Sequence, residues 1–408
     1  MKYLFIIPQY HAKGHSSNIN TLMFLDALKT KGHDITILSL DNQKLEYPAT
    51  EIVDGVKVIS LIDSRDKGTL KLGKGKSYKE LNPIFKAYIK YSSYLKRMFK
   101  NKTDEWPIDA VSYGLIRKYL DKEYDAIIST SHPFVSHVIA SYLKRKGYAK
   151  KWVAFVWDPY VYNYTLSTKG IKQRKSTVLK AFNNVDRVYY LKGILGKNHK
   201  EGFYLSNKET ENEIVLPSLR KREVIAPLNN TVPTLLYAGT FYEDIRNPEE
   251  MFKVLLKIDS EFFMSIFYFG CQDIIDKYHQ EFKGRIVTNP IVDKEEIHRL
   301  ESESSILINL GNSITNQLPG KTFELISSGK PIINFYFTEE DPALEYFRKY
   351  PICFSFNLNK YTDKDILDLE KFIKENINTN ISFEEATKKL QSERSEAVIS
   401  KVIENLEN

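Results

Sequence analysis

The chain has 408 residues, of which 42% are hydrophobic and 13% aromatic, and its net charge is +7. This length exceeds one ordinary domain and suits two lobes of about 200 residues each. The sequence has neither the run of about 18 uncharged apolar residues that a membrane span needs nor the apolar core of a signal peptide, so we expect a cytoplasmic protein. Its two cysteines, Cys271 and Cys353, stand far apart without ligand-spaced histidines, which excludes a disulfide framework or a zinc site.

Strands and helices alternate in the first half of the chain. Residues 2–7 form a short apolar strand, residues 18–31 place leucines at helical spacing, and a second buried strand follows at 34–40. This β-α-β order predicts a right-handed crossover in a parallel sheet. Further strands are expected at 56–61, 125–130, 152–157 and 187–191, with a helix at 134–146.

The positive charge is concentrated in residues 65–102, which hold 12 Lys or Arg against 2 Asp or Glu. This confinement indicates one local anionic partner and argues against nucleic acid. Residues 84–102 have the pattern of a basic amphipathic helix, whose apolar face would carry Ile84, Tyr88, Tyr91, Leu95 and Met98. Such a helix suits peripheral contact with the anionic inner face of the cell membrane. A helix packed on its own lobe, with a solvated lysine face, is the alternative.

A proline-containing stretch interrupts the pattern near the middle of the chain, and strands alternate with helices again after it. We therefore predict an α/β protein in which two Rossmann-like, doubly wound parallel sheets face each other across a cleft. The first lobe would span 1–220, the linker 221–232 and the second lobe 233–381. A polar helix at 382–408 would cross back to the first lobe. Ligands of such sheets bind outside the carboxyl ends of the strands.

The first informative loop of the second lobe follows the strand that begins at Thr234. Gly239 and Thr240 stand directly after this strand, where a missing side chain lets a ligand approach the backbone. Arg246 comes next, and Asn247 begins a helix with Pro248 at its first position. A glycine turn, a guanidinium group and a helix N-terminus together suit a diphosphate, although a plain turn with a solvated arginine has the same composition.

A second informative loop spans Gly311 to Gln317 and leads into a helix after Pro319-Gly320. The first turn of that helix carries Lys321, whose charge suits a phosphate, and the second carries Glu324, which could accept hydrogen bonds from a ribose. Taken alone, Lys321 and Glu324 have the spacing of a surface ion pair.

The string LPGKTFELISSGKPII, which contains these two residues, resembles the donor-site signature of the retaining GT-B glycosyltransferases of family 4. The resemblance implies that Glu324 binds the ribose of a nucleoside diphosphate sugar and that Arg246 and Lys321 contact its diphosphate, with Gly239 nearby. Many members of this family carry a second glutamate earlier in the chain, with seven residues between the two, and Asn316 occupies that position here. Gln317 and Leu318 would offer backbone amides to the sugar and the phosphate.

The first lobe also resembles this family, in Ser129 to Pro133, in His137 and in Trp157-Asp158-Pro159. His132 ends a strand and would orient the acceptor, or it is a turn former. Asp158 is a base, a hydroxyl binder or a turn cap.

The loop after the first strand of the chain completes the expected acceptor side. Gly14, His15 and Ser16 stand at the beginning of the first helix and would line the site for a glycan or lipid-linked acceptor.

The resemblance implies transfer of a glycosyl group from a nucleoside diphosphate sugar to an acceptor hydroxyl, with retention, in bacterial cell-surface polysaccharide or glycan synthesis. His132, Asp158 and Asn316 are the candidate catalytic residues. We expect no cofactor and no metal, because no DxD-like pair or His-carboxylate cluster occurs. A sugar-nucleotide epimerase of the same fold and a non-catalytic glycosyltransferase-like subunit remain alternatives.

Overall fold

The computed structural model describes residues 1–7, 10, 16–39, 46, 47, 49–60, 71, 72, 116, 117, 119–131, 134–161, 167–194, 210–222 and 229–407. The chain forms two compact units. Unit 1 comprises Met1–Ile214 together with Ile399–Asn408, and unit 2 comprises Val215–Val398. Each unit has its own sheet, so the predicted α/β class with two Rossmann-like lobes is confirmed.

Unit 1 contains an eight-stranded sheet in the order β10-β9-β8-β7-β1-β2-β5-β4. All neighbours pair in parallel except β4 and β5, which form an antiparallel hairpin at one edge. The strands are β1 (Lys2–Ile7), β2 (Asp34–Ser39), β4 (Ala49–Val53), β5 (Val56–Ser60), β7 (Tyr124–Thr130), β8 (Ala149–Val156), β9 (Arg187–Leu191) and β10 (Glu211–Ile214). A separate two-stranded sheet pairs β3 (Glu46–Tyr47) with β6 (Lys71–Leu72). The expected strands of the first half are confirmed, and β4 and β10 were not foreseen.

The helices of unit 1 include α1 (Ser16–Thr30), α4 (Val135–Arg145) and α5 (Thr168–Ala181). Helix α4 packs on β7 and β8 through a buried polar group, because the Oγ of Ser129 lies 2.8 Å from Nδ1 of His137 and accepts a hydrogen bond from the indole of Trp152. Burial lowers the pKa of His137 to about 3. His137 is therefore a neutral core residue, and its place in the family-like string reflects packing.

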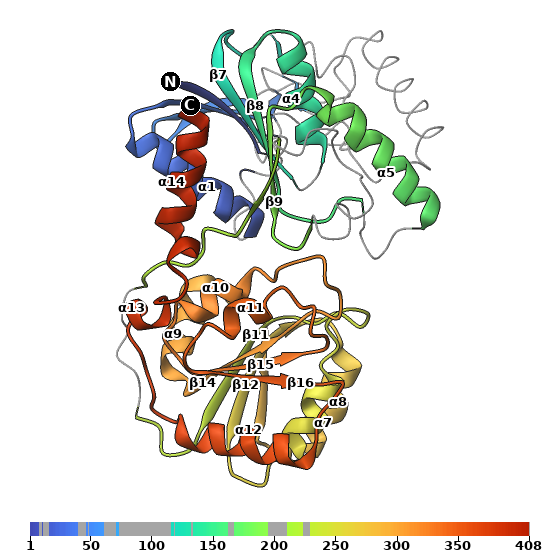
Figure 1. Ribbon diagram of the computed structural model, residues 1–408, viewed down its shortest axis with the longest axis vertical. Coiled ribbons are helices and arrows are strands. Elements are labelled where there is room, and N and C mark those ends of the chain that lie inside the picture. The colour runs from blue at the N-terminus through green and yellow to red at the C-terminus, as the bar shows by residue number, and fades with distance from the viewer. Residues whose placement is uncertain are drawn as a thin grey trace. The chain divides into compact units, whose positions relative to one another are not determined.

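The two ends of the chain meet at one imidazole in unit 1. The amino group of Met1 lies 3.2 Å from Nδ1 of His33, and the opposite ring nitrogen lies 3.0 Å from the carboxylate of Glu407, the last residue of α14 (Ser395–Glu407). Lys31 adds an ion pair to the same carboxylate at 3.2 Å. Figure 1 marks both chain ends at this place.

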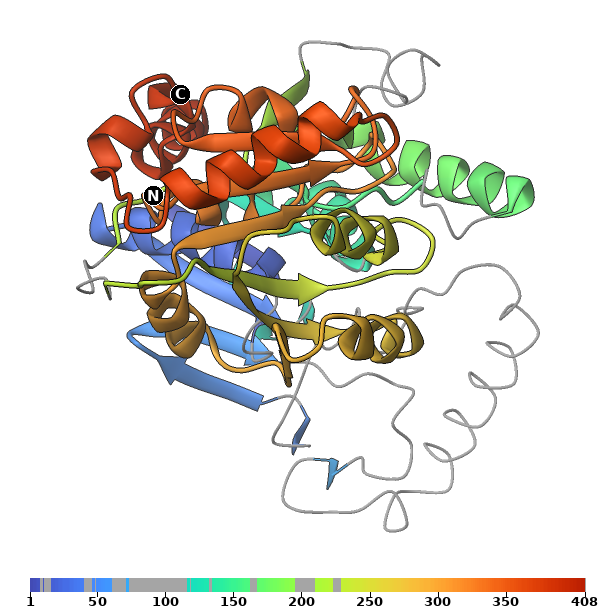
Figure 2. The same ribbon diagram turned by 90° about the horizontal axis from the view of Figure 1, so that it is seen from below.

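Unit 2 contains a six-stranded, fully parallel sheet in the order β13-β12-β11-β14-β15-β16. Its strands are β11 (Thr234–Thr240), β12 (Phe263–Phe269), β13 (Ile286–Asn289), β14 (Ile306–Leu310), β15 (Ile332–Tyr336) and β16 (Cys353–Asn357). Figure 1 shows α9 (Lys294–Glu303), α10 (Lys321–Ile326) and α11 (Leu344–Phe347) on one face of this sheet. Helices α7 (Glu249–Leu256), α8 (Gln272–Glu281) and α12 (Asp363–Glu375) cover the other, and α12 lies along the sheet in Figure 2.

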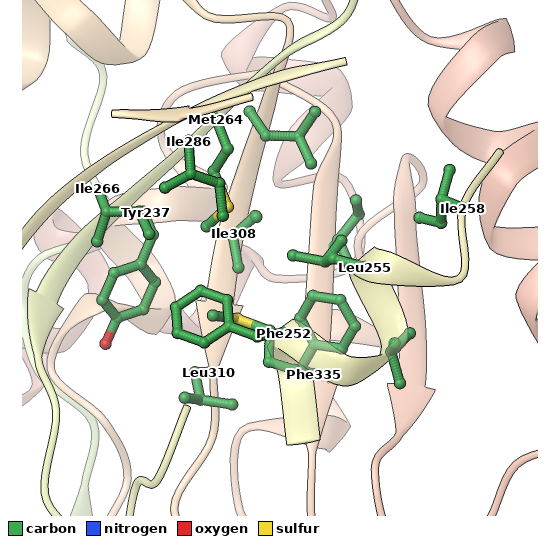
Figure 3. Close-up of a cluster of buried hydrophobic side chains, with 14 of the residues drawn as sticks. Tyr237, Phe252, Leu255, Ile258, Met264, Ile266, Ile286, Ile308, Leu310 and Phe335 are labelled. Carbon is green, nitrogen blue, oxygen red and sulfur yellow. The ribbon is translucent and has the colours of Figure 1, made fainter. Parts of the chain in front are cut away.

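The core of unit 2 lies between the sheet and α7, α8 and α12. Side chains from all six strands pack there with Phe252 and Leu255 of α7. Figure 3 shows part of this cluster. The central strand β14 is buried along its whole length. This packing fixes the carboxyl ends of β11 and β14, from which the two loops singled out in the sequence emerge.

The region after residue 381 differs from the single helix that we expected. It forms α13 (Phe383–Ala386), a 3-10 turn (Gln391–Glu393) and α14, and its residues up to Val398 belong to unit 2. A capping box of Ser382 and Glu385 begins α13. The guanidinium group of Arg394 then folds back on Oγ1 of Thr387, and Leu390 between them is fully buried. These tertiary contacts outweigh the local helical pattern.

Among the described residues, no helix is long and apolar enough to cross a membrane.

Candidate donor-binding site

Arg246 is fixed at the carboxyl ends of β11 and β14. Its Nε donates to Oδ1 of Asn312 at 3.0 Å, and its Nη1 donates to the carbonyl of Thr240 at 3.4 Å. The main chains of Tyr242 and Arg246 exchange hydrogen bonds of 3.2 and 2.9 Å, which closes the loop between them. Gly239 and Thr240 are the last two residues of β11, where the sequence had placed them just after it. The arginine is thus held in place and does not move freely in solvent.

The N-terminus of α7 is satisfied within the protein. Asn247 Oδ1 accepts the backbone N–H of Glu249 at 2.9 Å, as a capping residue does, although the helix itself begins at Glu249, one residue later than the predicted first position, Pro248. Two glutamates occupy this first turn, and Glu249 pairs with Lys277 at 3.2 Å. Because the turn already has its cap and carries negative charge, it is a poorer place for a phosphate than the sequence indicated.

The loop after β14 is joined to the Arg246 loop. Ser313 donates its backbone N–H to the carbonyl of Ile245 at 2.7 Å, and Gly311 donates to the carbonyl of Phe335 at 2.8 Å. A Cβ on Gly311 would lie 2.4 Å from Oδ2 of Asp341, so only glycine fits beside this carboxylate. The two loops therefore form one rigid edge at the carboxyl end of the sheet.

Asp341 is a residue that sequence reasoning missed. It is 4% exposed, its Oδ1 accepts the N–H of Ala343 at 2.8 Å, and its Oδ2 is buried without a hydrogen-bond partner among the described residues. Burial raises the pKa of this carboxyl to about 6, while the Ala343 N–H and the charge of Arg246 act in the opposite direction. The residue follows β15 in a loop whose composition carries no motif.

Helix α10 presents the two residues of the family-like string. Lys321 is its first residue, and Glu324 follows one turn later, with both side chains half-buried. Burial lowers the pKa of the Lys321 ammonium group, and the charges of both Glu324 and Arg246 act on it. Lys321 therefore lies within electrostatic reach of Glu324 and Arg246, the two other residues expected at the donor site.

Glu324 is held in its ionised form. Burial alone would raise the pKa of its carboxyl group, but the ammonium group of Lys294, at 2.7 Å, holds the pKa below its ordinary value. The neighbouring cations Lys321 and Arg222 act in the same direction. A buried, ionised carboxylate is a strong hydrogen-bond acceptor for a ligand hydroxyl.

One face of α9 completes the surroundings of α10. Lys294, His298 and Glu301 are spaced i, i+4 and i+7 and so share a face. The carboxylate of Glu301 is paired with Arg222 from the segment before unit 2's first strand. Burial, followed by the charge of Arg222, lowers the pKa of His298. This face was not predicted from the sequence. Its sign in the sequence is a row of polar residues on the side of a helix that should pack against the sheet.

The sugar-side candidates occupy the loop before α10. Leu318 is fully buried, so its side chain belongs to the core and only its backbone can serve a ligand. Asn316 and Gln317 are half-buried, and each has a partner within the protein.

A cavity of 490 Å³ lies at the carboxyl ends of β12 and β13. Its lining includes two aromatic residues and several polar ones, and consists of Tyr268, Phe269, Gly270, Gln272, Thr288, Asn289 and Pro290. The loop that supplies Asn289 and Pro290 leads directly into α9, whose first residue, Lys294, pairs with Glu324. No motif in the sequence marked this cavity.

The first-lobe candidates are only partly described. Asp158 is half-buried and follows β8, where the neighbouring Trp157 donates its backbone N–H to Oγ of Ser131 at 3.0 Å. Ser16 is the first residue of α1. Gly14, His15 and His132 lie outside the described residues, as does the segment 84–102. Within the described ranges, no group of three or more His, Cys, Asp or Glu side chains could hold a metal ion.

No protein-family model matches the sequence, and no curated protein matches it. Solved structures match it over its whole length. Sucrose-phosphate synthase from Thermosynechococcus elongatus has a TM-score of 0.62 at 12% identity, with 100% of this chain and 98% of that chain covered. The lipopolysaccharide outer core galactosyltransferase WaaB in its apo form has a TM-score of 0.57 at 12% identity, with 100% of this chain and 99% of that chain covered. Anabaena HepE in complex with UDP-glucose has a TM-score of 0.57 at 11% identity, with the same two shares covered, 100% of this chain and 99% of that chain.

Proposed function

We propose that this chain, which has the GT-B fold with the two Rossmann-like lobes that the sequence predicted, is a glycosyltransferase. It would move a sugar from a nucleoside diphosphate sugar to an acceptor hydroxyl, with retention of configuration. The observation that carries the proposal is the grouping of Lys321, Glu324 and Arg246, because the charges of the latter two both act on the lysine. The family resemblance assigns these residues to the ribose and the diphosphate.

In this proposal, Glu324 accepts hydrogen bonds from the ribose, and Arg246 with Lys321 stabilises the negative charge that develops on the departing diphosphate. Arg246 is held by Asn312 and Thr240, so it needs little reorganisation when the charge appears. The nucleobase would occupy the cavity between β12 and β13, whose two aromatic lining residues suit a flat ring. The leaving diphosphate takes the acceptor's proton, and no protein nucleophile is required.

The sugar and the acceptor complete the proposal. Asn316 would bond a sugar hydroxyl as a neutral group, beside the backbone amides of Gln317 and Leu318. Gly14, His15, Ser16 and His132 would receive a glycan or lipid-linked acceptor, with Asp158 as a base or a hydroxyl binder.

The basic segment 84–102 would hold the protein against the inner face of an anionic membrane, where a lipid-linked acceptor is found. This setting corresponds to bacterial cell-surface polysaccharide or glycan synthesis.

Thermal unfolding in the presence of UDP-, GDP- and dTDP-sugars tests the donor site. A bound donor at 100 times its Kd stabilises the folded protein by about 2.7 kcal/mol, so one nucleotide class should raise the Tm. Glu324→Ala should abolish this rise, whereas Glu345→Ala, which removes an exposed glutamate from α11, should keep it. A rise in Tm that survives Glu324→Ala would refute the site.

A further inference from the structure

A segment of unit 2, residues 215–222, lies along α10 from one end to the other. A Cβ on Gly320, at the beginning of the helix, would lie 3.7 Å from the side chain of Leu216, so the segment passes beside this end. At its far end, the Oγ of Ser327 accepts the backbone N–H of Arg220 at 3.2 Å. The segment therefore supports the helix that carries Lys321 and Glu324.

Arg222 ends this segment with two charge-assisted contacts. One arm of its guanidinium group donates to the carboxylate of Glu301, and the other donates to the backbone carbonyl of Glu324. Because α10 has only six residues, this carbonyl belongs to the last four of the helix, which lack a partner within it. Arg222 thus holds the backbone of Glu324 while Lys294 holds its side chain.

Each of the two carboxylates around α10 forms an ion pair with a different cation. Glu301 pairs with Arg222, and the two side chains are 6% and 16% exposed, while Glu324 pairs with Lys294. The ammonium group of Lys321 has no ion pair or hydrogen bond within the part of the chain that the structure describes, although Glu301 is the first of the charges that act on it. The pairing of Glu301 with Arg222 therefore leaves Lys321 available.

We propose that Arg222 is a positioning residue of the donor site: by engaging Glu301 and the Glu324 carbonyl, it keeps the Lys321 ammonium group available for the donor's diphosphate. This inference rests on the proposed function. Without Arg222, the buried Glu301 carboxylate lacks its counter-charge, and Lys321, on which the charge of Glu301 already acts, is a cation that can supply one. Lys321 would then turn from the diphosphate toward Glu301.

The test compares the Kd of UDP, GDP and dTDP with the Kd of uridine, guanosine and thymidine. For the nucleotide that the wild-type protein binds, Arg222→Met should weaken binding of the diphosphate by about tenfold, the loss of one charge-assisted contact, and leave nucleoside binding unchanged. Adding Glu301→Gln should restore most of the diphosphate affinity, because the competing carboxylate is gone. Arg299→Met, which removes an exposed arginine from α9, is the matched control and should change neither.

Equal weakening of the diphosphate and the nucleoside would show a merely structural role and overturn the inference, as would wild-type affinity in Arg222→Met. If Arg222→Met does not fold, the comparison is made between Arg222→Met/Glu301→Gln and the wild type, which should bind the diphosphate within about threefold of each other. A larger loss in the double variant would overturn the inference. A wild-type protein that binds none of the three nucleoside diphosphates would overturn the proposed function as well, which separates the two failures.

Discussion

The ammonium group of Lys294 lies 2.7 Å from the carboxylate of Glu324. The two residues come from neighbouring helices, α9 and α10, and their pairing keeps a partly buried carboxylate ionised. One oxygen of Glu324 is engaged by the lysine, so the other can accept a hydrogen bond from a ribose. The ion pair thus keeps the carboxylate of Glu324 ready to accept a hydrogen bond before the nucleoside diphosphate sugar binds.

Replacing Lys294 by methionine should raise the pKa of Glu324, because burial would then act with less opposition. A carboxyl group whose pKa is lowered in the folded state stabilises the protein above its ordinary pKa, and this contribution is lost as the pH falls. The variant should therefore lose affinity for nucleoside diphosphates at a higher pH than the wild type when Kd is measured from pH 8 down to pH 4. Lys349→Met, which removes the partner of the exposed Glu345, serves as the control. Identical pH profiles would contradict the role of Lys294.

Loss of Arg246 should weaken binding of the diphosphate and should have a much smaller effect on the stability of the fold. Arg246→Met removes a charge-assisted contact, for which we expect about a tenfold increase in the Kd of a nucleoside diphosphate, or about 1.4 kcal/mol. Arg246→Lys keeps the charge but cannot reach Asn312 and Thr240 with the same geometry, so its affinity should be intermediate. Calorimetric titration gives both values. If the lysine variant bound as weakly as the methionine variant, geometry and not charge would be the requirement.

Asp341 should make the stability of unit 2 depend on pH. Its pKa is raised to about 6 in the folded state, so the folded protein binds a proton more tightly than the unfolded chain between pH 4 and 6. Stability from this group is present at low pH and is lost as the pH rises through 6. The difference in unfolding free energy between Asp341→Asn and the wild type should therefore shift in favour of the variant by on the order of 2 kcal/mol between pH 4 and 7. Urea unfolding at a series of pH values measures it, and a constant difference would show that this carboxyl does not titrate in that range.

The basic segment can be tested directly on vesicles. We expect the protein to float with vesicles that contain anionic lipid and to stay in the lower fraction with neutral vesicles, because each Lys or Arg near such a surface contributes about 1 kcal/mol. Raising the salt concentration should release it. Replacing Lys86, Lys90, Lys96 and Lys100 by serine should weaken the flotation without changing the Kd for the donor. Flotation that ignores lipid charge would contradict the hypothesis.

The regular parts of this fold could be predicted because they depend on short-range patterns. Buried strands such as 306–310 are short, mostly apolar runs, and the helix that begins at Lys321 follows a Pro-Gly turn. The contacts that shape the site have no such pattern. Arg222 meets Glu301 and Glu324 across separations of 79 and 102 residues, and only the folded sheet brings these groups together.

Asp341 and the C-terminal region show the same limit. A lone aspartate in a loop gives no sign that its carboxylate will be buried beside Gly311. The residues after 381 have helical composition throughout, yet Arg394 and Thr387 form a tertiary contact that divides them. Local helix propensity determines the secondary structure of such a region only when no other contact competes with it.

His33 contacts residues from both ends of the polypeptide, through Met1 on one ring nitrogen and Glu407 on the other. A short peptide could therefore join residues 1 and 407 without disturbing the sheet, and new ends could be opened at an exposed turn elsewhere. Such a circularly permuted chain should fold, since the contacts that define each unit do not depend on where the backbone is cut. The arrangement makes the protein a practical scaffold for placing a reporter or a tether at a chosen loop.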